Sequence, residues 1–399
     1  MRILWIPSYQ PGSYFPAVPI ALELARRGHE LTVLCEAGSE HAFGALGFGF
    51  HPTSRLDAYR AEAERPVDRE AKRRWHAGYA PALFADVTAE LGARRYDLVM
   101  VDPLEPGADF AAEAASVPSF SYVHWRMDET GADVPFCFHL WDRERPAAEA
   151  FVEWWNELRA LVGLPAESRP FAEHRWYRHS RWLTLILGLP ELAHPKGELP
   201  PYAARVGPLA WEPPGDGAPA DWVDGLGQDR PAVLASVSTV GRADAELVAV
   251  IAGAVEREDL DVVLTVPSYG ELPDLPENVR LAGFVPHSAL LERVAVALCH
   301  AGNGIVTRAA CAGVPLLLFP DGRDRFEVAR GAVAAGVAIT LPRDGLSASR
   351  TRASIRTLLD EPRYRLSATA LAEAARKYSA ATDAADRVEE LAERRVTAS

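Results

Sequence analysis

The chain has 399 residues, of which 48% are hydrophobic and 24% charged, and this composition predicts a globular protein of two or three domains. The net charge of −13 and the scattered basic residues argue against nucleic-acid binding, which needs a concentrated positive surface. No apolar run reaches the ~20 residues that cross a bilayer, and the N-terminal apolar segment is too short for a signal peptide. We therefore expect a cytoplasmic protein that binds no membrane.

The first half of the chain alternates apolar strands with helices. Strands at residues 2–7 and 30–35 enclose an amphipathic helix at 17–27, which predicts a βαβ unit with parallel strands. A charged segment at 56–74 is expected to be helical. Further strands are predicted at 96–102, 118–123 and 183–187, and a further helix at 107–115.

Aromatic residues crowd the stretch from 136 to 182. Core packing of long helices explains most of them, whereas an apolar acceptor pocket is the alternative interpretation. Prolines and glycines then crowd residues 195–227, a composition typical of a linker.

The second half repeats the α/β pattern. Strands are expected at 232–236, 261–266, 279–282, 294–298, 316–319 and 338–341, and helices at 243–257, 288–293 and 326–335. Four cysteines lie far apart and show no metal-ligand spacing, so no metal site is expected.

The strand ending at Leu298 is followed by His300, Gly302 and Gly304, and then by a helix-permissive run. A strand, a glycine turn and a helix start direct backbone N–H groups and a helix dipole at an anion. Glycines also let a diphosphate approach the backbone closely. An ordinary strand-to-helix connection is the alternative, because a Gly-x-Gly turn alone is a weak signal.

Five segments in the second half follow strand ends, where doubly wound folds bind ligands. They are Ser236-Val237-Ser238-Thr239, Phe284-Val285-Pro286-His287, residues 300–307, Gly313-Val314-Pro315 and residues 320–325. In this order and spacing they resemble the donor half of family 1 glycosyltransferases, and more closely the bacterial branch that glycosylates macrolides, enediynes and aromatic polyketides. Residues 12–16 and 24–31 extend the resemblance to nearly the whole chain.

The resemblance implies an α/β protein of the GT-B fold, with two Rossmann-like doubly wound domains facing across a cleft. The implied divisions are an acceptor-binding domain at 1–210, a linker at 211–230, and a donor-binding domain at 231–375. A helix at 376–399 is expected to pack back on the first domain.

The same resemblance assigns donor contacts. An aromatic ring at Phe284 stacks on the nucleobase, residues 300–304 hold the diphosphate, and Asp324 accepts hydrogen bonds from sugar hydroxyls. The full donor set is Ser238, Thr239, Phe284, Val285, His287, His300, Gly302, Asn303, Gly304, Ile305, Asp324 and Arg325.

Some positions depart from the family pattern. Ile305 replaces a hydroxyl residue that usually contacts phosphate, and Arg308 stands where some relatives carry a glutamate for the ribose. Arg325 replaces a glutamine, which suggests an unusual sugar, such as a deoxysugar or one with an acidic or oxidised group. Ser13 replaces the histidine that serves as general base, and a serine near its ordinary pKa cannot act as a base at neutral pH.

Three residues are candidate replacements for that base: Asp102, His124 and Asp128. Each has a structural alternative. His124 could be a satisfied, partly buried histidine, and Asp128 could cap a helix. An acceptor of low pKa would need little base, so the identity of the base stays open.

The sequence thus predicts an inverting glycosyltransferase that uses a dTDP- or UDP-linked sugar, with dTDP favoured, and needs no metal or other cofactor. The acceptor is expected to be a hydrophobic natural product, bound near Tyr14 and Phe15. An auxiliary homologue of a partner transferase and a sugar-nucleotide epimerase are the alternatives. A homodimer is left open.

Overall fold

The computed structural model describes residues 1–63, 69–124, 147–167, 180, 182–192, 199, 201–213, 222–237, 244–266, 272–283, 285–321 and 325–396. These residues form two compact units. The first consists of Met1–Leu187, His194–Leu209 and Ser379–Ser399, and the second of Gly188–Ala193 and Ala210–Tyr378.

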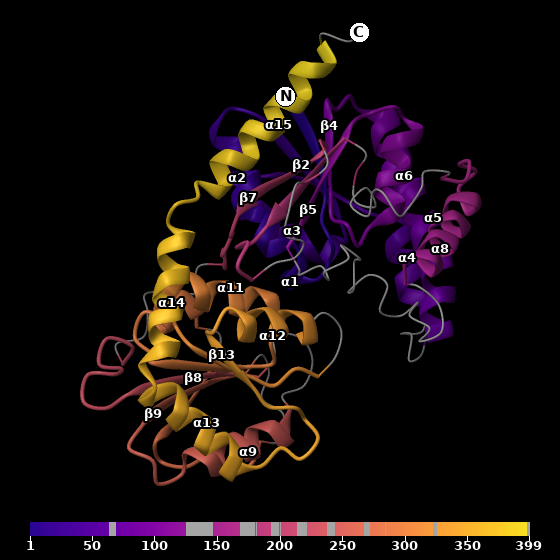
Figure 1. Ribbon diagram of the computed structural model, residues 1–399. Helices are drawn as coiled ribbons and strands as arrows, with labels where there is room; N and C mark the ends of the chain where they lie inside the picture. Colours follow the sequence, from indigo (N-terminus) through magenta and orange to yellow (C-terminus); the bar gives the residue numbers. More distant parts are fainter. Residues whose placement is uncertain are drawn as a thin grey trace. The chain divides into compact units, whose positions relative to one another are not determined.

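The first unit is built on a parallel sheet with the strand order β3-β2-β1-β4-β5-β6-β7 (Figure 1). Its elements in chain order are β1 (Arg2–Ile6), α1 (Pro11–Tyr14), the 3-10 helix η1 (Phe15–Ala17), α2 (Val18–Arg26), β2 (Glu30–Cys35), the 3-10 helix η2 (Ala37–Ser39), α3 (Glu40–Gly44), β3 (Gly49–Pro52), α4 (Arg55–Glu62), α5 (Arg69–Ala93), β4 (Leu98–Val101), α6 (Pro106–Ala114), β5 (Ser119–Val123), α8 (Ala147–Leu161), β6 (Leu183–Leu187), β7 (Ala203–Gly207) and α15 (Ala380–Val396).

The second unit is built on a parallel sheet with the order β10-β9-β8-β11-β12-β13. Its elements are β8 (Ala232–Ser236), α9 (Ala245–Val255), β9 (Asp261–Thr265), β10 (Val279–Ala282), α10 (His287–Leu291), β11 (Val296–Cys299), α11 (Asn303–Ala312), β12 (Leu316–Leu318), α12 (Arg325–Ala334), β13 (Ala338–Thr340), α13 (Ala348–Asp360) and α14 (Pro362–Ala375). The α/β class and the two doubly wound sheets predicted from the sequence are confirmed.

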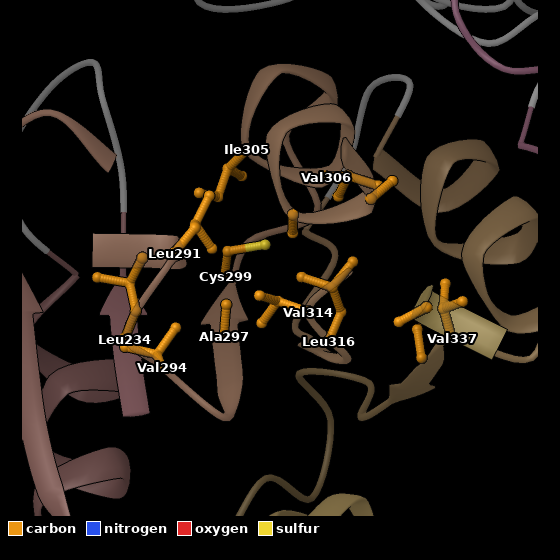
Figure 2. Packing of buried hydrophobic residues seen from close by; sticks show 14 of the residues in the cluster. Leu234, Leu291, Val294, Ala297, Cys299, Ile305, Val306, Val314, Leu316 and Val337 are labelled. Atoms are coloured by element: carbon orange, nitrogen blue, oxygen red, sulfur yellow. The ribbon is translucent and has the colours of Figure 1, made fainter. Parts of the chain in front are cut away.

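The inner strands β11 and β12 of the second sheet are apolar and buried throughout because both of their faces are covered. Alternate residues of β11 point to opposite faces. Ala297 and Cys299 join one cluster with residues of α10, α11 and α12, whereas Val296 and Leu298 join another with residues of α9 and α13 (Figure 2 shows the first cluster). This double covering fixes where the carboxyl ends of the strands, and hence the loops that follow them, emerge.

Helix ends in both units are set by local chemistry. The Asp244 carboxylate accepts a hydrogen bond from the N–H of Leu247 at 3.0 Å and caps α9. Gly28 ends the α2 turn with φ of +86°, a conformation that favours glycine. The chain can therefore reverse at once into β2.

The last helix, α15, belongs to the first unit, although residues 210–378 of the second unit separate it from β7 in sequence. It lies against α2, β6 and β7 (Figure 1). The Arg27 guanidinium on the turn after α2 contacts the carboxylates of Asp386 and Glu389, both at 2.6 Å. His29 Nε2 lies 2.8 Å from Glu389 Oε1.

Several elements differ from the sequence-based expectations. The predicted charged helix at 56–74 is two helices, α4 and the much longer α5, which contains Pro81. β7 lies within the proline- and glycine-rich stretch interpreted as a linker. No helix within the described ranges has the length and apolarity needed to cross a membrane.

Candidate active site

Residues 300–304, here called the diphosphate turn, join β11 to α11. β11 pairs with β8 inside the sheet, and the strand order reverses at this pair: β9 and β10 lie beyond β8, whereas β12 and β13 lie beyond β11. Doubly wound sheets bind ligands outside the carboxyl ends of the strands at such a reversal. The turn therefore occupies the position where this fold concentrates ligand contacts.

The backbone of the diphosphate turn is unusual. Ala301 has φ of +63°, a left-handed conformation that is uncommon for a residue with a side chain. Such strain is commonly found at functional sites. Gly302 precedes α11 and supplies no side-chain cap to its first turn. N–H groups in a first helical turn have no intrahelical acceptor, and the helix dipole there favours an anion.

The His300 imidazole lies against this turn and is only 6% exposed. Burial, reinforced by the charge of Arg325, lowers the pKa of His300 to about 4, so the ring is neutral at physiological pH. Its Nδ1 is buried and has no hydrogen-bond partner among the residues that the structure describes. A Cβ at position 302 would lie 2.6 Å from Nε2, so glycine is needed for this ring position.

Ile305, predicted to be a donor contact, points its side chain into the protein. It is 5% exposed and belongs to the cluster that contains Leu291 and Cys299 (Figure 2). A phosphate contact at this position would come from the backbone N–H. The Ile305 side chain thus packs α11 against the core, where a hydroxyl residue would offer a polar group.

His287 opens α10 and is also buried, with Nε2 3.1 Å from Thr265 Oγ1. Burial, together with the nearby Arg308 charge, lowers the pKa of His287 to about 4. The His287 ring is therefore neutral at physiological pH, and its Nε2 is engaged with the Thr265 hydroxyl. Val285, two residues earlier, packs partly buried against the core cluster shown in Figure 2.

Two arginines, each paired with a carboxylate, lie near the diphosphate turn. Arg325 begins α12 and forms an ion pair with Asp321, and Arg343 Nη2 lies 3.6 Å from Asp321 Oδ2. Both arginines act electrostatically on His300. The predicted donor residues His300 and Arg325 therefore lie in one electrostatic neighbourhood.

Five predicted site residues lie outside the described residues. They are Asp128, Ser238, Thr239, Phe284 and Asp324.

In the first unit, Asp102 follows β4 beside β1, where the strand order of that sheet also reverses. It is fully buried. Oδ1 accepts a hydrogen bond from the N–H of Leu104 at 2.9 Å, Oδ2 accepts one from the Tyr122 hydroxyl at 3.0 Å, and the N–H of Ser8 donates a third. Burial raises the pKa of Asp102 to about 6 despite these bonds.

Glu105, three residues on, was not singled out from the sequence. Its carboxyl group hydrogen-bonds Tyr79 and Ser8, and burial followed by the Asp102 charge raises its pKa well above the usual range. Oε2 has no hydrogen-bond partner within the described chain. The side chain lines a cavity with Tyr9 and Arg60 that has about 10 Å³ of space for a water centre, enough for one water molecule.

The other predicted residues of this unit surround the same sheet edge. Ser13 is 6% exposed in α1, and its N–H donates to the carbonyl of Gln10 at 2.9 Å. The Tyr14 ring packs 5.0 Å from Phe15 and 5.1 Å from Phe43. Burial raises the pKa of Tyr14 to about 12, so its phenol stays neutral. His124 is buried and directly follows β5, the strand that pairs with β4. It therefore lies at the same edge of the sheet as Asp102.

Comparisons with known proteins agree with this architecture. Residues 238–391 match the family model "Erythromycin biosynthesis protein CIII-like, C-terminal domain". The chain is 28% identical to the 4'-demethylrebeccamycin synthase of Lentzea aerocolonigenes, with 98% of this chain and 99% of that protein covered. The calicheamicin glycosyltransferase CalG4 matches with a TM-score of 0.79 at 23% identity, and 98% of each chain is covered. The chain is a glycosyltransferase of the GT-B fold, similar to those of natural-product biosynthesis.

A second solved structure, the glycosyltransferase VinC in complex with dTDP, matches the present chain with a TM-score of 0.76 at 24% identity. The match covers 99% of this chain and 100% of VinC. Within the ranges that the structure describes, no group of three or more His, Cys, Asp or Glu side chains is placed to hold a metal ion.

Sequence reasoning missed two carboxylates of this glycosyltransferase. Glu105 was not considered, because only the fold brings it into contact with Ser8. Glu212 lay in the assumed linker, yet it contacts α10 and α11. Neither position carries a local sequence signal, because its partners are distant in sequence.

Proposed function

We propose that this glycosyltransferase is an inverting enzyme that transfers a sugar, with a deoxysugar favoured, from a dTDP-sugar to a hydrophobic natural product. The observation that carries the proposal is the diphosphate turn at the strand-order reversal, with buried His300 and the first turn of α11 side by side. The VinC complex with dTDP supports the choice of nucleotide, since that protein shares the fold.

Transfer begins with in-line attack of the acceptor on the anomeric carbon, which displaces the nucleoside diphosphate. Negative charge then grows on the leaving diphosphate. The first turn of α11, neutral His300 as a hydrogen-bond donor and the arginines near it stabilise that charge before the reaction starts. This stabilisation comes from the protein's own groups.

The acceptor proton needs a base in the absence of a histidine at position 13. Among the candidates, Asp102 has the best-defined setting. Its pKa of about 6 leaves it ionised at neutral pH and close to the range that suits a general base. Ser8 connects it to Glu105. Tyr14 and Phe15 would then lie close to the acceptor.

Calorimetric titration with dTDP and UDP, followed by turnover of dTDP-sugars with a panel of aromatic and macrolide aglycones, tests the proposal. We expect tighter binding of dTDP than of UDP and a glycosylated product from the purified protein alone. Ser13 favours a second candidate, an auxiliary homologue. Donor binding with transfer only after a partner is added would support it, whereas a change in the donor without any acceptor would indicate an epimerase.

A further inference from the structure

Glu212 lies on the segment by which the chain enters the second unit, just after β7. Its side chain is 11% exposed. Oε2 accepts a hydrogen bond from the N–H of His287 at 3.0 Å, and Oε1 accepts one from the N–H of Ser288 at 2.7 Å. These amides open α10, whose preceding residue is Pro286, a residue with no side-chain cap to offer. Glu212 thus holds the start of α10 from a distant part of the chain.

The same carboxylate meets Arg308 on α11. Arg308 Nε lies 3.5 Å from Glu212 Oε2, and both side chains are 11% exposed. Arg308 Nη1 also donates to the carbonyl of Trp211 at 3.3 Å. Its Nη2 would lie 3.5 Å from a Cβ at position 304, so the guanidinium rests on the diphosphate turn.

These contacts join the two parts of the predicted donor site. α10 begins at His287, two residues after Val285, which is predicted to contact the nucleobase; Val285 and Pro286 are here called the nucleobase loop. α11 starts within the diphosphate turn. A nucleoside diphosphate must bind both parts at once, so its affinity depends on their spacing. Fixing that spacing before binding lowers the ordering cost of association.

We propose that Glu212 is a positioning residue of the donor site, which, with Arg308, fixes the spacing between the nucleobase loop and the diphosphate turn. The inference rests on the proposed function, because it assumes a nucleoside diphosphate at this site. It assigns Arg308 to this ion pair and not to direct contact with the ligand.

The test compares Glu212→Gln, Arg308→Met and the double variant in the full chain. We expect each single variant to weaken dTDP binding about tenfold and to raise the KM for the donor similarly, with the KM for the acceptor unchanged. Affinity for thymidine alone and for pyrophosphate alone should change less than twofold. The double variant should lose no more than the worse single variant, because both remove one interaction. Arg308→Lys should keep most of the affinity.

Glu258→Gln is the matched control. Glu258 lies in the same unit, is 14% exposed and pairs with Arg356 at 2.9 Å, away from α10 and α11. We expect its dTDP affinity to equal that of the wild type.

Unchanged dTDP affinity in Glu212→Gln would overturn the positioning role. Tighter binding would overturn it too, because it would mean that Glu212 only holds Arg308 away from the diphosphate. Equal loss of dTDP, thymidine and pyrophosphate together with a large fall in Tm would assign Glu212 to folding instead. Wild-type protein that binds neither dTDP nor UDP would overturn the proposed function itself.

Discussion

The carboxyl groups of Asp102 and Glu105 meet at Ser8 inside the first unit, where burial makes ionisation costly. Asp102 has a pKa of about 6 in the folded protein, against ~3.9 for an exposed aspartate. As pH rises, the unfolded chain therefore releases this proton first. The folded state loses stability between about pH 4 and pH 6 and regains it on acidification.

Asp102→Asn removes this titration. We expect the free energy of unfolding of the wild type to fall, relative to the variant, by on the order of 2 kcal/mol between pH 4 and pH 7.5. Urea denaturation at several pH values measures the difference. A constant difference across this range would mean that Asp102 is already ionised at pH 4.

The same aspartate and Ser13 separate the candidates for the base. We expect Asp102→Asn to lower kcat/KM by 10²–10⁴-fold, the usual contribution of general base catalysis. Wild-type kcat/KM should fall below about pH 6, where Asp102 gains a proton. Ser13→Ala should keep much of the activity. An inactive Ser13→Ala enzyme with normal donor affinity would indicate instead that Ser13 takes part in deprotonating the acceptor.

His300 is expected to donate a hydrogen bond to the diphosphate. A hydrogen bond to a charged group contributes about 1.5–3 kcal/mol, so His300→Ala should weaken dTDP binding roughly 10- to 100-fold. Because the pKa of His300 is about 4, its protonation adds no pH dependence to this affinity between pH 6 and pH 8. Calorimetry gives both results. His51→Ala, a partly exposed histidine of the first unit, is the control.

At the scale of elements, the diphosphate turn depends on the absence of a side chain at Gly302. Gly302→Ala would place a Cβ against the His300 ring, at 2.6 Å from Nε2, and must displace it. We expect about tenfold weaker dTDP binding and a stability loss of ~1–3 kcal/mol from overpacking. Gly225→Ala is the control, because its Cβ meets only the Trp222 carbonyl at 3.8 Å. Normal affinity in Gly302→Ala would show that the ring position is unimportant.

Sequence patterns predicted the strands well where both faces of a sheet are covered. β8, for example, has the predicted bounds, because an unbroken apolar run leaves little choice. β7 was missed because Arg205 and the surrounding prolines and glycines weaken its apolar pattern. α5 was underestimated because Gly78, Pro81 and Gly92 interrupt it.

The candidate site divides in the same way. The strand, turn and helix around His300 follow from adjacent residues, and the structure has this geometry; its role in donor binding stays a prediction. Glu212 could not be found from the sequence, because its partners His287 and Arg308 are 75 or more residues away. Side chains that only the fold brings together do not form a recognisable motif in the sequence.

At the scale of the whole molecule, α15 completes a unit that begins with Met1. Val388 on α15 is fully buried. Val388→Asp would bury an unpaired charge, so we expect it to destabilise the first unit by several kcal/mol. Hydrogen exchange should speed up in α2 and β7 and stay unchanged in α11. Leu366→Asp, at a 68% exposed position of α14, should change neither. Equal exchange rates in α2 for both variants would show that α15 adds no stability there.

This discontinuous unit also sets an order of events during synthesis. The ribosome makes β1 to β7, then residues 210–378 of the second unit, and only then the helix that lies on α2. At ~5–20 residues per second, the first unit waits roughly 10–40 s for α15. During that interval the surface of α2, β6 and β7 that α15 will cover is open to chaperones and to other nascent chains. A chain truncated within the second unit therefore lacks α15, and the surface of α2, β6 and β7 stays exposed to aggregation. Stable folding of the first unit thus requires that translation reach the C-terminal helix.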